Sequence, residues 1–384
     1  MYEKTRVLLI CADLIPSIIL CGHVQLEELD RQGVLEYRMK YERALRKDDL
    51  EWSDIVIFGR SDSSFSVKVA RKLKDSGRKL FYIIDDDLLN VPAYFSSGMH
   101  YAQKSVKKYI RAMLDICDGI ITPSLKLKEL YAAPGKSCII VDEPAVLIKS
   151  EIHQSHYPIK IGVAGSVDRT GDVENILEGA LKRIKTEYGD KVQFEFFGAI
   201  PDFAKELDAD VIPFCSSYDE YLKRLHEANW DIGLAPMPDS SFHECKHFIK
   251  YIEYSSAGIC TICSDVVPYI RLKEYDSPAV FCKNTLDDWY SSIKGLLDNL
   301  VYLQNCRQYN MKFIYENLSV GIAADRFLRN ISSEYVWKEN EKVNISFLKC
   351  MYVETLVYRL MAILKVYGFR TPLVLFKKIK NRLM

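Results

Sequence analysis

The sequence contains no uncharged apolar run of about 18 residues, so it predicts no membrane-spanning helix. It also lacks net charge, because 52 basic residues (Lys and Arg) balance 52 acidic ones, which argues against a nucleic-acid partner. The opening MYEKTR leads directly into an apolar run, without the pattern of a signal peptide. These absences predict a cytoplasmic chain.

The cysteines lack the regular spacing of a disulfide framework, and their number, 11, is odd. Both features favour reduced thiols in the cytosol. The one CxxC motif, Cys260 to Cys263, lies in an apolar run that is typical of a buried strand. We therefore expect neither a metal site nor a redox site there.

What the sequence does have is length, at 384 residues, and 48% apolar residues, which suits two domains. Short apolar runs alternate with helical patterns, and this alternation predicts parallel α/β sheets. The runs are 6–12, 54–58, 79–84, 119–124 and 136–143, and then, after the polar stretch 147–158, 159–165, 193–198, 209–214, 231–236 and 258–264. The predicted fold is two tandem Rossmann-like, doubly wound domains, at 1–150 and 158–330, with a ligand cleft between them.

Gly165 and Ser166 follow the first predicted strand of the second domain and precede a helix. Small residues in this place let backbone N–H groups and a helix N-terminus approach a phosphate. Arg169 in the same loop can add a charge-assisted hydrogen bond. A plain turn with an exposed arginine remains the alternative.

The stretch FHECKHFIKYIEYSSAGIC, residues 242–260, predicts a helix over 244–257 that carries Lys246, Lys250 and Glu253 within an arc of about 60°. Two ammonium groups suit a diphosphate, and a carboxylate suits the two hydroxyls of a ribose. The small residues at 255–258 would let the helix end approach a ligand closely. The alternative is a solvated face of salt bridges.

Several stretches resemble the retaining nucleotide-sugar glycosyltransferases of the GT-B fold, in the group that contains glycosyltransferase family 4, and bacterial surface-polysaccharide enzymes in particular. They are IKIGVAGSVDRTGDVENI, DIGLAPMPDSSFHECKHFIKYIEYSSAGICTICSDVVPY, the DDW that ends at Trp289, and FYIIDDDLLNVP. The resemblance covers residues 1 to about 330. It implies catalytic roles for Lys246, Lys250 and Arg169 at the diphosphate, and donor binding by Gly165, Ser166, His243, Glu253, Tyr254 and Gly258.

The function that the resemblance implies is transfer of a hexosyl group, with retention, from a nucleoside diphosphate sugar to a glycan or polyprenyl-linked acceptor in surface polysaccharide synthesis. UDP or GDP is the expected nucleotide, and neither a metal nor another cofactor is expected. Cys245 departs from the family pattern, because many members have there a first glutamate that contacts the donor sugar. His243 and His247 also depart from it, and each is either a donor to phosphate or a polar residue flanking the helix. A nucleotide-sugar epimerase and a non-catalytic partner subunit remain alternatives.

Three carboxylates, Asp85, Asp86 and Asp87, follow a predicted strand of the first domain. Carboxylates in this place can bind a metal or act as a base, or they can cap the next helix. Because the family does not need a metal bound by such a motif, we expect Asp86 to contact the acceptor.

The end of the chain, residues 331–384, predicts a helical extension that is apolar on one face between Met351 and Val366 and basic from Lys365 to Arg382. Such a segment can lie on an anionic membrane, which makes a peripheral location at the membrane one expectation. Packing of the same helix on the first domain is the other.

Overall fold

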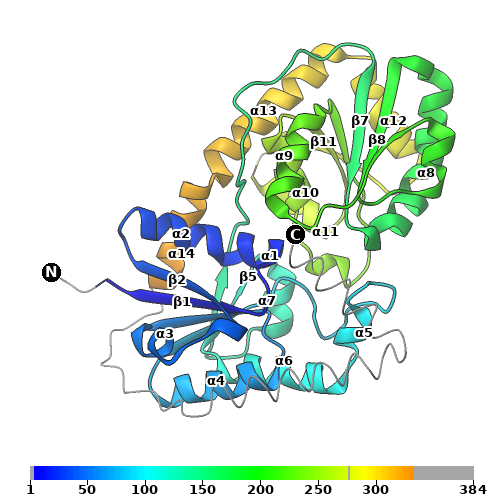
Figure 1. The fold of residues 1–384 in the computed structure, drawn as a ribbon. Coiled ribbons are helices and arrows are strands. Elements are labelled where there is room, and N and C mark those ends of the chain that lie inside the picture. The colour runs from blue at the N-terminus through cyan, green and yellow to red at the C-terminus, as the bar shows by residue number, and fades with distance from the viewer. Residues whose placement is uncertain (1–3, 276, 333–384) are drawn as a thin grey trace. The chain divides into compact units, whose positions relative to one another are not determined.

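The computed structural model describes residues 4–275 and 277–332, which form two compact units (Figure 1). Of these residues, the first unit contains 4–141 and 324–332, and the second contains 142–323. Each unit is built around one parallel sheet of six strands.

The sheet of the first unit has the strand order β2-β1-β3-β4-β5-β6, and all its pairs are parallel. Its strands are β1 (Arg6–Cys11), β2 (Glu36–Tyr41), β3 (Ile55–Gly59), β4 (Lys79–Ile83), β5 (Gly119–Thr122) and β6 (Ser137–Ile140). The four inner strands are almost continuously apolar, as expected for strands that are covered on both faces.

Helices cover both faces of this sheet, and alternate residues of each strand face opposite layers. Leu8 and Val56 point towards α4 and α6, whereas Leu9 and Ile57 point towards α2 and the end of α14. The helical segments are α1 (Pro16–Ile18), the π-helix η1 (Ile19–His23), α2 (Val24–Arg31), η2 (Glu42–Ala44), α3 (Lys47–Trp52), α4 (Ser64–Asp75), α5 (Gly98–Tyr101), α6 (Lys104–Ile116), α7 (Leu125–Tyr131) and α14 (Val320–Ser332), which begins in the second unit.

The second sheet has the order β12-β11-β10-β7-β8-β9, again entirely parallel. Its strands are β7 (Ile159–Ala164), β8 (Val192–Phe197), β9 (Asp210–Ile212), β10 (Ile232–Ala235), β11 (Cys260–Ser264) and β12 (Val280–Cys282). The chain runs outwards from β7 through β8 to β9 and then returns to β10 on the other side of β7. The strand order therefore reverses between β7 and β10.

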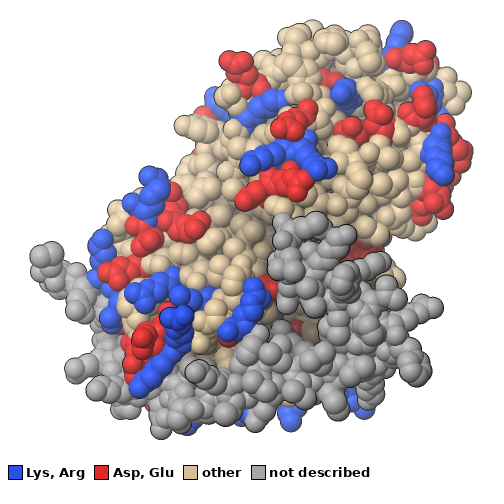
Figure 2. All heavy atoms as spheres, viewed as in Figure 1, with Lys and Arg blue, Asp and Glu red and all other residues tan. Residues whose placement is uncertain are grey.

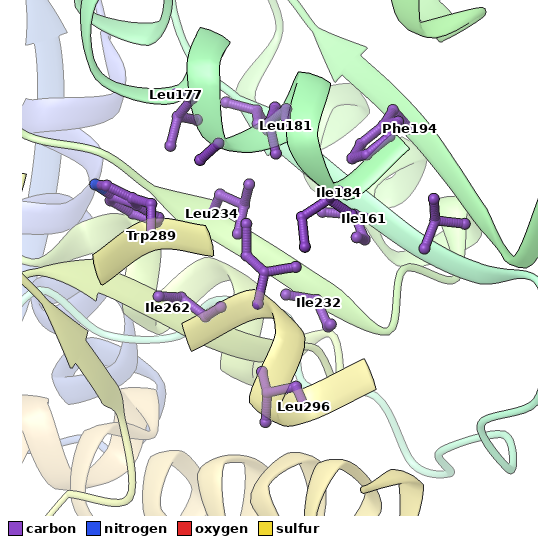
Figure 3. Close-up of a cluster of buried hydrophobic side chains, with 14 of the residues drawn as sticks. Ile161, Leu177, Leu181, Ile184, Phe194, Ile232, Leu234, Ile262, Trp289 and Leu296 are labelled. Atoms are coloured by element: carbon purple, nitrogen blue, oxygen red, sulfur yellow. The ribbon is translucent and has the colours of Figure 1, made fainter. Parts of the chain in front are cut away.

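The core of the second unit also has two layers. On one face, Ile161, Ile232 and Ile262 pack against Leu177 and Leu181 of α8 and Trp289 of α12 (Figure 3). On the other face lie α9, α10, α11 and part of α13. The helical segments are η3 (Val167–Arg169), α8 (Thr170–Tyr188), η4 (Gly189–Lys191), η5 (Asp202–Leu207), α9 (Tyr218–Ala228), η6 (His243–Cys245), α10 (Ile249–Ser256), α11 (Val267–Glu274), α12 (Leu286–Leu297) and α13 (Leu300–Leu318).

The division into units differs from the expected domain bounds at both ends of the second domain. The polar stretch from Asp142 onward belongs to the second unit, although residues up to 150 were expected in the first. Ala324, Phe327 and Ile331 lie in the core of the first unit, although the second domain was expected to continue to 330.

The predicted buried strand at Cys260 and Cys263 is confirmed as β11, and the ten described cysteines, from Cys11 to Cys306, are free thiols. Among the described residues, no helix combines the length and apolar character needed to cross a bilayer. The amphipathic, basic extension expected from Met351 onward lies outside the described residues and stays a prediction.

Candidate functional site

The reversal of strand order places a candidate site at the carboxyl ends of β7 and β10, where open α/β sheets bind ligands. The Tyr254 hydroxyl joins these two ends: it accepts from the Ala164 N–H at 2.7 Å and lies 3.4 Å from the Leu234 carbonyl oxygen. The Tyr254 ring is fully buried. Tyr254 was expected to bind the donor, but the structure gives it the role of holding the strand ends.

The loop after β7 is packed closely against the end of β8. The Gly165 N–H donates to the Phe197 carbonyl at 3.0 Å. Contrary to the expectation, this amide is therefore not available to a phosphate. Gly198 has φ +80°, and a Cβ there would lie 2.3 Å from the Gly165 carbonyl oxygen, so only glycine fits. Ser166, the next residue of the loop, is exposed.

Arg169 is held at the reversal by groups from both strands' loops. Its Nε lies 3.1 Å from Asp172 Oδ2, and its Nη2 donates to the Pro236 carbonyl at 3.1 Å. His243 Nε2 lies 3.6 Å from the same Asp172 oxygen, and His243 Nδ1 lies 2.7 Å from Ser240 Oγ. Asp172 thus brings together Arg169 and His243, two of the expected site residues, and we call these four side chains and Pro236 the arginine cluster.

The expected helix over 244–257 is wrong in its first part. Residues 243–245 form the short helix η6, the backbone at Lys246 is extended with ψ 169°, and α10 begins only at Ile249. Lys246 therefore does not share a helix face with Lys250, contrary to the expected common arc. The Lys246 ammonium lies 4.7 Å from the centre of the Phe242 ring.

Lys250 and Glu253 of α10 form a partly buried polar cluster with two tyrosines of α9. Glu253 Oε2 accepts from Lys250 Nζ and from the Tyr221 hydroxyl, each at 2.7 Å, and Oε1 accepts from the Tyr218 hydroxyl at 3.1 Å. Burial and the Glu253 charge raise the pKa of both tyrosines, so both hydroxyls remain donors. We call these four residues the glutamate cluster; Glu253 already supplies the anion that Lys250 needs.

The two clusters act on one buried phenol, that of Tyr269 in α11. Burial raises the Tyr269 pKa well above its usual range, while the Arg169 charge lowers it and the Glu253 charge raises it. Arg169 lies in the loop that leaves β7, and Glu253 lies in the helix that follows β10, so both belong to segments that leave the carboxyl ends of these neighbouring strands.

Gly258 lies away from this region, although it was expected to bind the donor. It follows α10 and precedes β11, so it lies at the amino end of that strand, opposite the carboxyl edge. Its φ of +72° ends the helix, and its carbonyl accepts from Arg307 Nε at 2.7 Å. A helix that returns to start the next parallel strand must end at this edge, so the expectation for Gly258 is not retained.

In the first unit, the strand order reverses between β1 and β3, and Arg60 follows β3. Arg60 Nε lies 3.1 Å from Asp85 Oδ1, and Nη2 donates to Asp86 Oδ2 at 3.1 Å. Burial lowers the Arg60 pKa, but the carboxylates outweigh it and raise the pKa overall, so Arg60 stays charged. Asp86, expected to contact the acceptor, is already engaged by this arginine.

Asp87, the third carboxylate, accepts from Asn90 Nδ2 at 2.9 Å and from the Tyr131 hydroxyl. This contact lies at the turn after β4 and is not the expected helix cap, because the next helix, α5, begins only at Gly98. Within residues 4–275 and 277–332, no three His, Cys, Asp or Glu side chains are arranged as a metal site.

Neither a protein-family model nor a curated protein matches the sequence. Solved structures do. An alpha-glucosyltransferase in complex with UDP and a 13-mer DNA containing an HMU base has a TM-score of 0.58 at 13% identity, over 86% of this chain and 100% of that one. The chain has the GT-B fold.

Two further structures share this GT-B architecture with the chain. A protein assigned as a UDP-N-acetylglucosamine 2-epimerase from Listeria monocytogenes has a TM-score of 0.54 at 12% identity, over 86% of this chain and 97% of that one. TarM has a TM-score of 0.50 at 13% identity. The match covers 72% of this chain and about half (54%) of the length of TarM. The predicted fold class, two tandem Rossmann-like domains, is confirmed.

Sequence reasoning missed Asp172, Tyr218, Tyr221 and Glu143 as contacts of the expected site residues. Asp172 could have been found, because it lies three residues after Arg169 at the start of a helix, where such pairs meet. Tyr218 and Tyr221 share a helix face, but nothing local indicates that Glu253 is their partner. Glu143 gives no local signal either, since its partner His247 is 104 residues away in the sequence.

Proposed function

We propose that the chain is a glycosyltransferase that moves a hexosyl group, with retention and without a donor-bound metal, from a nucleoside diphosphate sugar to a glycan or lipid-linked acceptor in surface polysaccharide synthesis. The observation that carries the proposal is the placement of Arg169 at the reversal of strand order, held by Asp172 and the Pro236 carbonyl. Such an arginine is oriented before a ligand arrives. Among the described residues its Nη1 has no partner, which leaves it for a phosphate oxygen.

In this proposal, Arg169, Lys246 and Lys250 act on the departing diphosphate, where negative charge grows as the bond to the sugar breaks. Lys250 is held by Glu253 and the Tyr221 hydroxyl at 2.7 and 2.8 Å, so its ammonium is positioned in advance. We include His243 and Ser166 in the proposed site as further hydrogen-bond donors to the nucleotide-sugar donor.

Glu253 would still hold the ribose. Its Oε1 accepts one hydrogen bond, from Tyr218, and a carboxylate oxygen can accept two. Because Glu253 is only 4% exposed, a ribose hydroxyl would reach Oε1 only if the side chains that cover it shift.

A DNA acceptor is not part of the proposal. Basic and acidic residues balance over the whole chain, and on the face shown in Figure 2 they lie interspersed over the described residues. A surface that binds the phosphate backbone collects basic side chains instead.

Calorimetric titration with UDP, GDP, CMP and dTDP tests the donor site. We expect one diphosphate to bind selectively, and both Lys246→Ala and Lys250→Ala to weaken it about tenfold or more, because each removes a charge-assisted contact worth roughly 1.5 to 3 kcal/mol. Lys246→Ala is the cleaner variant, because it leaves the Lys250–Glu253 ion pair intact.

The matched control is Lys182→Ala in α8, a partly exposed lysine paired with Glu178 and Glu206. It should bind the nucleotide as the unchanged protein does. The proposed donor site would be wrong if no nucleotide binds at millimolar concentration, or if all three variants lower the nucleotide affinity equally.

Two alternatives share the fold. An epimerase would convert the sugar nucleotide without an acceptor. A non-catalytic subunit would bind a donor weakly or not at all; Cys245, which replaces the glutamate expected to contact the donor sugar, is the reason to consider this alternative. Nuclear magnetic resonance of the product separates them, since it reports whether a glycosidic bond forms and whether its anomeric configuration is retained. Activity that is unchanged by a chelator would support independence of a metal.

A further inference from the structure

A buried histidine beside the glutamate cluster, His247, makes no hydrogen bond through either ring nitrogen within the described residues, although a carboxylate lies close to one of them. The His247 side chain is 3% exposed, and its Nδ1 lies 2.9 Å from Oε2 of Glu143, whose side chain is 7% exposed. Within the described part of the chain, His247 Nε2 is buried and has no hydrogen-bond partner. Buried polar nitrogens are nearly always paired, so this one points to a ligand.

The pair lies at the carboxyl edge of the second sheet. His247 belongs to the extended stretch between η6 and α10, directly after Lys246. Burial raises the pKa of the Tyr218 hydroxyl, and the charges of Glu253 and Glu143 raise it further. Two carboxylates therefore flank one phenol, and Glu143 with His247 continues the glutamate cluster.

The chemistry of the pair distinguishes it from the cations nearby. A carboxylate beside Nδ1 favours the ring proton on Nδ1, which leaves a lone pair on Nε2. A lone pair accepts from hydroxyl groups; a diphosphate has none to offer, whereas a sugar has several. The three cations of the proposed site already match the diphosphate.

We propose that His247 Nε2 accepts a hydrogen bond from a hydroxyl group of the donor sugar, and that Glu143 fixes the imidazole for this contact. The inference rests on the proposed function and deepens it by assigning a sugar-recognition pair. Glu143 is a positioning residue, because it acts on the sugar only through His247.

The test compares the affinity of each nucleoside diphosphate with that of its sugar conjugate: UDP with UDP-glucose and UDP-N-acetylglucosamine, and GDP with GDP-mannose. In the unchanged protein, the best conjugate should bind at least tenfold tighter than its free diphosphate. His247→Phe should abolish that gain, which we expect to be about 10- to 100-fold. The affinity of the variant for the free diphosphate should stay within about twofold of that of the unchanged protein.

His247→Gln should restore part of the gain, because its amide oxygen can accept, and Glu143→Gln should reduce the gain without abolishing it. A variant that folds badly loses both ligands, so the ratio of the two affinities reports the contact itself.

Three results would overturn the inference: no sugar conjugate gains affinity in the unchanged protein, His247→Phe keeps the gain, or every variant weakens both ligands equally. In each case selective binding of a free diphosphate would leave the proposed function standing. If no nucleotide binds at all, both proposals fall.

Discussion

At the residue scale, the site depends on side chains that the fold holds before any ligand is present. Asp172 orients Arg169 and His243, and Glu253 orients Lys250. A cation that is already immobilised loses little conformational entropy when an anion binds. In the proposed site, the carboxylates of Asp172 and Glu253 therefore position the cations that would bind the diphosphate.

A second histidine of the same unit, His226 in α9, gives a prediction for pH. Burial, aided by the Lys149 charge, lowers the His226 pKa to about 4 from an ordinary value of 6.5. Because the folded pKa lies below the unfolded one, the stabilisation is complete above pH 6.5 and is lost as the pH falls towards 4. At pH 5 the loss is about 2 kcal/mol, or a Tm roughly 4 to 8 °C lower.

His226→Gln removes this titration. Between pH 7.5 and pH 5, the Tm of the variant should therefore fall by roughly 4 to 8 °C less than the Tm of the unchanged protein. Scanning calorimetry at the two pH values measures the difference. The same change at exposed His156 is the control and should leave the pH dependence as it was. Parallel Tm curves for His226→Gln and the unchanged protein would contradict the assignment.

At the element scale, the loop after β7 depends on a close approach of two backbones. Gly198→Ala would place a methyl group 2.3 Å from the Gly165 carbonyl oxygen, at φ +80°. We expect the variant to lose about 3 kcal/mol or more of unfolding free energy, from the strained φ and the steric clash together, and to bind UDP or GDP more weakly because Arg169 follows this loop.

Gly77→Ala is the matched control, since Gly77 has φ +84° but nothing lies within 4 Å of the added methyl group. It carries only the cost of the φ angle, about 1 kcal/mol. Thermal unfolding and nucleotide titration compare the two variants. If they prove equally stable, the loop can move aside and its close packing does not define the site.

The elements were largely predictable, and the exceptions have physical causes. Strands buried on both faces read as unbroken apolar runs, which is why β1, β3 and β7 were found. The edge strand β2, EYRMKY, is half-exposed and was missed for that reason, as was the short edge strand β12.

The error at Lys246 has a different origin. The apolar spacing continues through residues 242–252, so periodicity alone cannot detect the break before α10. The site was predictable where partners lie within one helical turn, as with Lys250 and Glu253. It was not predictable where partners meet only through the fold, as with Asp172 and His243 or Glu143 and His247.

At the scale of the whole molecule, the chain enters the second unit once and returns to the first at its C-terminal side. Ala324, Phe327 and Ile331 of α14 pack in the same core layer as Val7 and Leu9 of β1. The core of the first unit is therefore incomplete until residues more than 300 positions later in the sequence have been added. A boundary placed by the polar stretch and the last predicted strand cannot reveal this return.

Phe327→Ala tests the dependence in the intact chain. Phe327 is 1% exposed, and truncation of a buried phenylalanine costs about 3 to 5 kcal/mol. Because the lost contacts belong to the first unit, hydrogen exchange should accelerate in β1, β3 and β5 and stay unchanged in β7 and β10. The control is Tyr315→Ala in α13, where the side chain is 67% exposed and exchange should change little. Faster exchange confined to β7 and β10 would mean that α14 supports the second unit, and faster exchange in both sheets would mean that the two cores unfold as one cooperative structure.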